Sequence, residues 1–107
     1  MYCTTGLWST QCIAEARRHH PDGVVEVLNN SSTNHTKLQD PETWNIDPEA
    51  SFLHICVNET VHGFKINETN FPWDKFPADM TIVGDMSSCI GTEPINWKRY
   101  SVVYAGA

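Results

Sequence analysis

The chain has 107 residues, of which 40% are hydrophobic, and it carries a formal net charge of −6 at pH 7. This size and composition are typical of a globular chain with one modest core. The acidic balance argues against a nucleic-acid partner, whose binding sites normally contain clustered Lys and Arg. No apolar run reaches the length of a membrane span, and the four Cys and five His show no metal-ligand spacing. We therefore expect no membrane and no metal site.

The expected secondary structure alternates strands with one helix. Residues 1–6 have the composition of the end of a strand, and helical spacing of apolar residues predicts a helix over Ser9–His20, with Ser9 as its N-cap. The Pro-Asp-Gly run at 21–23 ends that helix. Residues 29–45 are polar and are expected to form an excursion outside the core. Further strands are expected at residues 24–28, 51–57, 80–84 and 100–104.

These strands are short continuous apolar runs and not clean alternations, which is typical of strands covered on both faces. Together with the helix they predict an α/β fold with a mostly parallel sheet. No repeat, low-complexity tract or internal boundary divides residues 1–107. Both ends of the chain have strand-like sequences, so we expect the chain to be a segment of a larger α/β enzyme.

Polar or aromatic residues follow three of the expected strands. Trp8 comes just before the helix, residues 58–60 (Asn-Glu-Thr) follow a buried strand, and Asp85 ends another. Ligands of open α/β sheets bind outside the carboxyl ends of the strands. Taken singly, each residue has an ordinary structural explanation, as a core tryptophan, a turn threonine or a capping aspartate.

Taken in order, the motifs are specific, and they resemble phosphoserine aminotransferase, a pyridoxal-phosphate enzyme of fold type I. The resemblance covers nearly the whole chain. Its motifs are Thr-Gly-x-Trp-Ser at 5–9, Asp-Pro-x-Thr-Trp-Asn at 40–45, Asn-Glu-Thr-x-x-Gly at 58–63, Asp-Met-Ser-Ser at 85–88, Pro-Ile at 94–95 and Val-Val-Tyr-Ala-Gly-Ala at 102–107.

The resemblance implies a pyridoxal 5'-phosphate site in the large cofactor-binding domain of this fold, of which residues 1–107 form a part. Trp8 would stack on the pyridine ring, Thr60 would hydrogen-bond to the cofactor near its ring oxygen, and Asp85 would pair with the protonated ring nitrogen. His62 is expected to be a packing or solvent-facing residue, and Ser87 and Ser88 at most orient the strand end.

The activity implied is transfer of an amino group between glutamate and 3-phosphohydroxypyruvate, which gives phosphoserine and 2-oxoglutarate on the route to serine. The family's Schiff-base lysine follows Ala-Gly-Ala-Gln, so it would lie beyond Ala107, and the segment alone is expected to be inactive. The implied assembly is a homodimer in the cytoplasm, or in a plastid if a transit peptide precedes the segment.

Two other interpretations remain open. Another fold type I aminotransferase would share Asp85 and the strand plan. A secreted, N-glycosylated, disulfide-containing binding module would account for the even number of cysteines and for five Asn-x-Ser/Thr sequons. Those sequons begin at Asn29, Asn30, Asn34, Asn58 and Asn67.

Overall fold

The computed structural model describes residues 1–106. A five-stranded sheet dominates this part of the chain, accompanied by an α-helix, three short 3-10 helices and a two-stranded hairpin. In chain order the elements are β1 (Tyr2–Thr4), α1 (Leu7–His19), β2 (Glu26–Asn29), η1 (Asn30–Thr33), η2 (Pro41–Thr43), β3 (Leu53–Cys56), β4 (Asn58–Glu59), β5 (Phe64–Lys65), η3 (Trp73–Lys75), β6 (Ile82–Asp85) and β7 (Val102–Tyr104).

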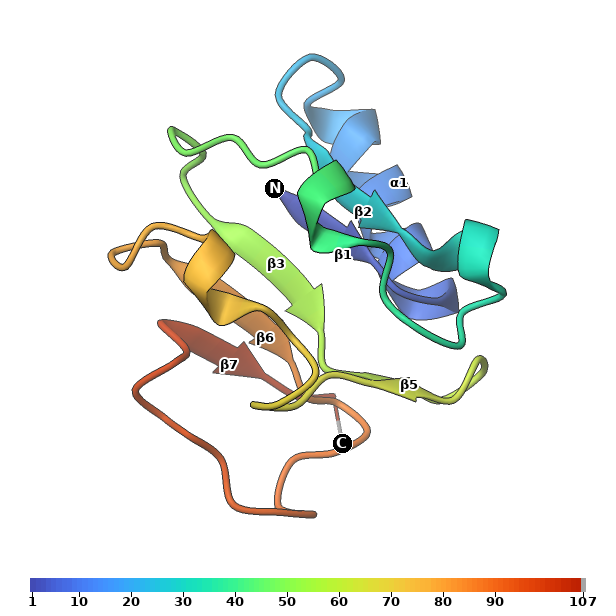
Figure 1. Ribbon diagram of the computed structural model, residues 1–107, viewed down its shortest axis with the longest axis vertical. Helices are drawn as coiled ribbons and strands as arrows, with labels where there is room; N and C mark the ends of the chain where they lie inside the picture. Colours follow the sequence, from blue (N-terminus) through green and yellow to red (C-terminus); the bar gives the residue numbers. More distant parts are fainter. Residues whose placement is uncertain (107) are drawn as a thin grey trace.

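The strands of the main sheet lie in the order β2-β1-β3-β6-β7, and every neighbouring pair is parallel (Figure 1). The predicted α/β fold with a mostly parallel sheet is therefore confirmed. After β1 the chain forms β2 along one edge of β1, and it then crosses over to form β3 along the opposite edge of β1. This change of direction makes a crevice at the carboxyl ends of β1 and β3, where ligands of such sheets bind.

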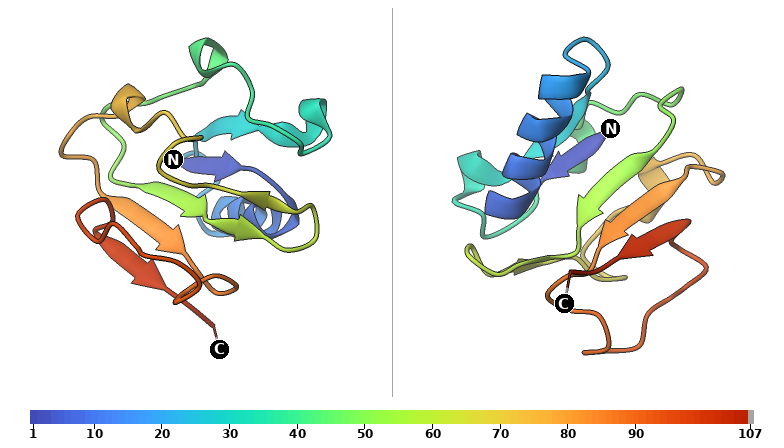
Figure 2. Two further views of the ribbon diagram at one scale, coloured as in Figure 1. Left: turned by 60° about the horizontal axis from the view of Figure 1, so that its bottom comes forward. Right: turned by 180° about the vertical axis from the view of Figure 1, so that it is seen from behind.

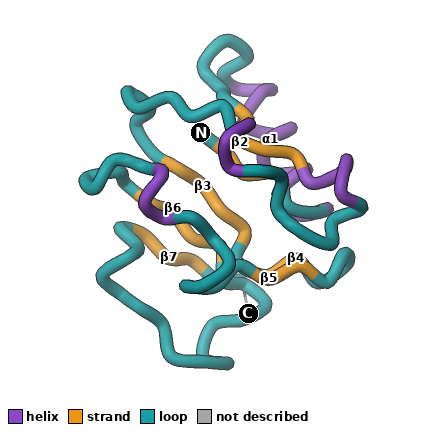
Figure 3. Tube along the Cα trace, in the orientation of Figure 1, coloured by secondary structure: helices purple, strands orange, loops and turns teal. Residues whose placement is uncertain are grey.

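The two faces of the sheet are covered differently. Helix α1 packs on one face of the sheet, against β1 and β3, and does not extend over β6 and β7 (Figure 2). The opposite face is covered by long loops that carry η2 and η3, drawn in teal and purple in front of the strands in Figure 3. Aromatic side chains from these loops, Trp44, Phe71 and Phe76, pack with strand residues such as Leu53 and Ile55 in the hydrophobic core. Most of the core therefore lies on the face opposite α1.

The structure corrects two expectations about element boundaries. The helix begins at Leu7 with Gly6 as its N-cap, and Ser9 occupies the third helical position. There the Ser9 hydroxyl oxygen accepts the backbone N–H groups of Thr5 and Gly6, at 2.8 and 3.0 Å. The expectation that residues 29–45 lie outside the core is wrong for Trp44, which is 8% exposed, because its ring packs against Phe71 and Phe76.

The hairpin β4–β5 was not expected from the sequence, because each strand has only two residues. Its turn contains Gly63 at φ +72°, a left-handed conformation that glycine adopts without strain. The predicted end of the helix at residues 21–23 is confirmed, since α1 ends at His19. Within residues 1–106 we find no helix with the length and apolar character needed to cross a membrane.

Candidate functional site

The three residues predicted from the sequence lie around one cavity. Trp8 is the second residue of α1, the helix that follows β1. Thr60 comes directly after β4, the short strand that follows β3, and Asp85 is the last residue of β6. The cavity has a volume of about 390 Å³ and opens at the carboxyl ends of the parallel strands. Its lining residues are Trp8, Cys56, Asn58, Thr60, Asp85, Ser87 and Ser88.

Trp8 and Thr60 are joined by a hydrogen bond across the cavity. The indole Nε1–H donates to the Thr60 hydroxyl oxygen at 2.9 Å, and the Trp8 side chain remains 45% exposed. A threonine hydroxyl has one hydrogen to donate. Because Trp8 uses Thr60 as an acceptor, the Thr60 O–H hydrogen is free to donate to a ligand oxygen. The same bond orients the indole ring.

Trp8 is also held through its backbone, by a buried carboxylate. Glu59 is fully buried, and its side chain accepts the N–H groups of Trp8 and Ser9, both at 2.9 Å. A carboxylate at this place satisfies free N–H groups of the first helical turn and interacts favourably with the positive end of the helix dipole. Glu59 thereby ties the start of α1 to the end of β3.

Sequence reasoning did not assign this role to Glu59. It treated residues 58–60 as a polar group after a buried strand and gave a function only to Thr60. The sequence does offer one indication of this role: Glu59 lies between a buried strand and a turn. A carboxylate buried there without hydrogen-bond partners would destabilise the fold, so a partner is expected. Its helix partner lies about 50 residues earlier in the chain, so the pairing could not be read from local sequence.

Asp85 is oriented by the residues that follow it. Its Oδ1 accepts the Ser87 backbone N–H at 2.9 Å and the Ser87 hydroxyl at 2.6 Å. Ser88 bonds instead to Asn58, with its hydroxyl oxygen accepting the amide Nδ2–H at 2.9 Å. These contacts connect the ends of β3 and β6.

His62 lies outside the cavity lining. It is exposed, its Nδ1 accepts the Leu7 backbone N–H at 3.0 Å, and its ring stacks on His35 with 3.9 Å between ring centroids. This arrangement agrees with the prediction of a packing or solvent-facing histidine.

The remaining reactive group at the cavity is the Cys56 thiol. Burial, with a further contribution from the Glu59 carboxylate, raises its pKa, so the thiol stays protonated at neutral pH and is a poor nucleophile. Over residues 1–106 the side chains form no cluster of three or more His, Cys, Asp or Glu that could hold a metal ion.

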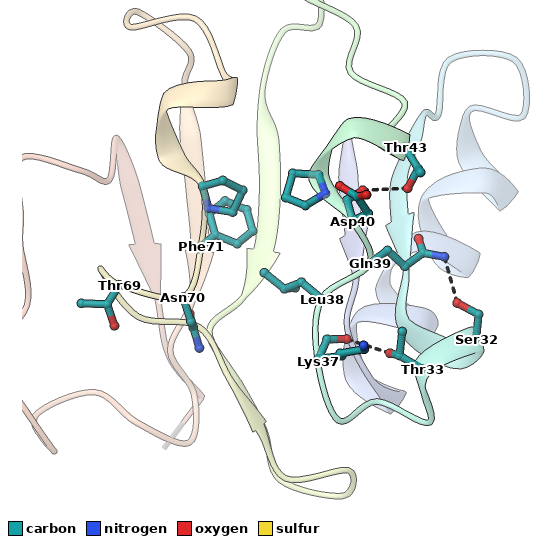
Figure 4. A pocket seen from close by; sticks show the side chains of 12 residues that line it. Ser32, Thr33, Lys37, Leu38, Gln39, Asp40, Thr43, Thr69, Asn70 and Phe71 are labelled. Atoms are coloured by element: carbon teal, nitrogen blue, oxygen red, sulfur yellow. Dashed lines mark hydrogen bonds between the residues drawn. The ribbon is translucent and has the colours of Figure 1, made fainter.

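A second cavity, of about 670 Å³, lies between the loop around η1 and residues 69–72 (Figure 4). It contains none of the residues predicted to be functional. Its polar side chains mainly hold the surrounding loop in place: the Gln39 amide donates to Ser32, and the hydroxyls of Thr33 and Thr43 donate to backbone carbonyls. Its polar groups therefore serve local structure.

The groups around the first cavity define the chemistry of a fitting ligand. Trp8 presents an aromatic surface, Thr60 a hydroxyl donor and Asp85 a carboxylate acceptor. A flat aromatic ring with one N–H group and an oxygen acceptor would satisfy all three.

Comparison with known proteins gives a consistent result. The chain is 35% identical over 107 residues to a phosphoserine aminotransferase of Polaromonas sp. and 34% identical over 106 residues to one of Drosophila melanogaster. In each case 99% of this chain is covered, but only 28% and 27% of the relative. No family model matches the chain.

Solved structures agree with the sequence relatives. The phosphoserine aminotransferase of Bacillus circulans subsp. alkalophilus matches 98% of this chain with a TM-score of 0.77 and 27% identity. The pyridoxal-phosphate-bound enzyme of Trichomonas vaginalis matches 97% with a TM-score of 0.79 and 28% identity. The chain covers 27% and 29% of these two structures. The family recognised from the motifs is thus confirmed, and this chain belongs with the phosphoserine aminotransferases, of which it spans a little more than a quarter of the length.

Proposed function

We propose that the complete protein encoded by the gene for this chain is a phosphoserine aminotransferase that uses pyridoxal 5'-phosphate. It would exchange an amino group between glutamate and 3-phosphohydroxypyruvate, giving phosphoserine and 2-oxoglutarate. The observation that carries this proposal is the meeting of Trp8, Thr60 and Asp85 around one cavity. The similarity to phosphoserine aminotransferases over 99% of the chain supports it.

The residues present fit this cofactor, and each has a distinct task. The Asp85 carboxylate would accept the pyridine N–H and hold the proton on the ring nitrogen. Thr60 would donate its free hydroxyl hydrogen to a cofactor oxygen, and Trp8 would stack on the ring and shield it from water. When bound, the cofactor supplies an electron sink for the carbon that loses its proton during amino transfer.

The reacting amine is proposed to come from outside residues 1–107. Members of the family use a lysine placed shortly after an Ala-Gly-Ala run, and none of the lysines among residues 1–106 lines the cavity. Lys65 and Lys75 instead form ion pairs with Glu93 and Glu42. Residues 1–107 alone would therefore be inactive. We further propose a homodimer in the cytoplasm, or in a plastid where a transit peptide directs it.

The substitution Asp85→Asn in the complete protein tests the proposal. An amide cannot hold the proton on the pyridine nitrogen, so we expect the transamination rate to fall by at least about 100-fold, while the unfolding midpoint stays close to that of the wild type. Asp79→Asn is a matched control, because Asp79 is exposed, does not line the cavity and precedes β6, whereas Asp85 ends it. Retention of wild-type activity by the Asp85 variant would overturn the assignment.

The choice of amino acceptor separates this function from other fold type I aminotransferases. A phosphoserine aminotransferase should use 3-phosphohydroxypyruvate far better than unphosphorylated 2-oxo acids. If an unphosphorylated 2-oxo acid were turned over equally well or better, the cofactor assignment would stand, but the protein would be a different fold type I aminotransferase.

A further inference from the structure

Asp85 belongs to a series of hydrogen bonds that crosses β7, β6 and β3 on the face of the sheet against which α1 packs. Strands β3, β6 and β7 pair in register, with Cys56 opposite Asp85 and Asp85 opposite Tyr104. His54 lies two residues before Cys56, so its side chain points to the same face of the sheet. The Tyr104 hydroxyl lies 3.2 Å from Asp85 Oδ2 and 2.9 Å from His54 Nε2.

The chemistry of these groups determines which of them donates in each hydrogen bond. An ionised carboxylate only accepts hydrogen bonds, so the single Tyr104 hydroxyl hydrogen goes to Asp85. The Tyr104 oxygen must then accept from His54, which requires the imidazole to carry its hydrogen on Nε2. Burial lowers the pKa of His54, which favours a neutral ring with one N–H.

The imidazole is held in place by its neighbours. His54 is 5% exposed, and the Tyr2 ring packs against it with 5.4 Å between centroids. The Cys12 sulfur from α1 lies 3.8 and 3.7 Å from the two ring nitrogens. A sulfur nearly equidistant from both nitrogens packs against the ring and is not in line with one N–H. The ring cannot swing away from Tyr104 without displacing these side chains.

We propose that Tyr104 and His54 are positioning residues that present one free lone pair of Asp85 to the ring nitrogen of the cofactor. This inference rests on the proposed function. A carboxylate has about four acceptor positions. Ser87 occupies two through Oδ1 and Tyr104 occupies one through Oδ2, which leaves one for the pyridine N–H. The three donors hold the carboxylate in a single orientation.

The test uses Tyr104→Phe in the complete protein, with Tyr100→Phe as the matched control. Both substitutions remove one hydroxyl, but the Tyr100 hydroxyl does not contact Asp85 or His54. Removal of a hydrogen bond to a charged group predicts about tenfold weaker binding of pyridoxal 5'-phosphate by Tyr104→Phe. Tyr100→Phe should bind within about twofold of the wild type. Equal affinity of the two variants would overturn the proposal.

A second pair of variants separates the hydrogen bond from packing. His54→Gln keeps an amide N–H that can reach Tyr104, whereas His54→Leu has no donor. We expect Gln to preserve cofactor affinity within about threefold and Leu to weaken it about tenfold. Equal losses in both variants would show that the imidazole only fills space.

A measurement without cofactor tests the hydrogen-bond chain by itself. Nitrogen-15 NMR of the apoprotein should find His54 as the neutral tautomer protonated on Nε2, and this Nε2 resonance should shift in Tyr104→Phe but not in Tyr100→Phe. If the wild type instead carried the proton on His54 Nδ1, the proposed hydrogen bond from His54 to Tyr104 would be wrong. If the wild type failed to bind pyridoxal 5'-phosphate, the proposed function and this role would both be wrong, although the NMR result would still report on the hydrogen bonds.

Discussion

Two side chains buried in or beside the site, His54 and Cys56, show how burial sets charge at the scale of single residues. Burial lowers the pKa of the His54 ring, which keeps it neutral, and raises the pKa of the Cys56 thiol, which keeps it protonated. Both shifts have the same cause, because desolvation penalises the charged form of either group.

The stability of the protein should depend on pH through His54. Burial lowers its folded-state pKa below the ordinary histidine value of about 6.5, so below about pH 6.5 the unfolded chain binds more protons than the folded one. Stability is therefore present above this pH and is lost as pH falls. Within that window the loss is at most about 1.4 kcal/mol per pH unit.

Urea unfolding of the complete protein between pH 8 and 5.5 measures this effect. The His54→Gln variant should show a shallower loss of unfolding free energy than the wild type. His20→Gln, at the exposed end of α1, is the control and should keep the wild-type slope. A wild-type slope in His54→Gln would contradict the prediction.

At the scale of elements, the junction between α1 and β4 determines where Trp8 stands. The helix start packs so closely on Glu59 that a Cβ on Gly6 would lie 2.7 Å from the Glu59 Cδ atom. Glu59 cannot move aside, because its two oxygens already bond to Trp8 and Ser9. The glycine of the Thr-Gly-x-Trp-Ser motif is therefore required by this close approach.

Gly6→Ala should destabilise the protein by about 1–3 kcal/mol, as overpacking of a tight site does. It should also weaken cofactor binding, since Trp8 would shift with the helix. Gly23→Ala is the matched control, because a Cβ there meets only His20 Cβ at 3.9 Å. Denaturant unfolding of both variants gives the comparison, and a Gly6 variant as stable as the Gly23 variant would refute the close-packing argument.

At the scale of the whole molecule, the cysteines distinguish an α/β enzyme from a disulfide-containing module. All four cysteines are free, and Cys3, Cys56 and Cys89 are buried. The sheet and its core hold the molecule together without a cross-link. Burial raises the pKa of every one of these thiols, which keeps them protonated and slow to react in the native state.

We expect Cys3, Cys12, Cys56 and Cys89 all to react with a thiol reagent after denaturation without reductant. In the native protein the three buried thiols should react much more slowly. Recovery of fewer than four reactive thiols among these positions would indicate a disulfide and would favour the secreted module.

The sequence alone determined the class of fold, the five main-sheet strands to within a few residues and the three residues around the cavity. These features depend on local composition: short apolar runs form buried strands, and polar residues that end such runs fall at the carboxyl edge of a parallel sheet. The motif order was also sufficient to recognise the family.

The tertiary structure alone decided the contacts that give those residues their roles. Glu59 reaches the start of α1 across about 50 residues, and Tyr104 links Asp85 to His54 across strands β7, β6 and β3. Trp44 enters the core from a polar segment because Phe71 and Phe76, far along the chain, provide its packing surface. Such pairings depend on strand register and on the order of strands in the sheet, which local sequence does not specify.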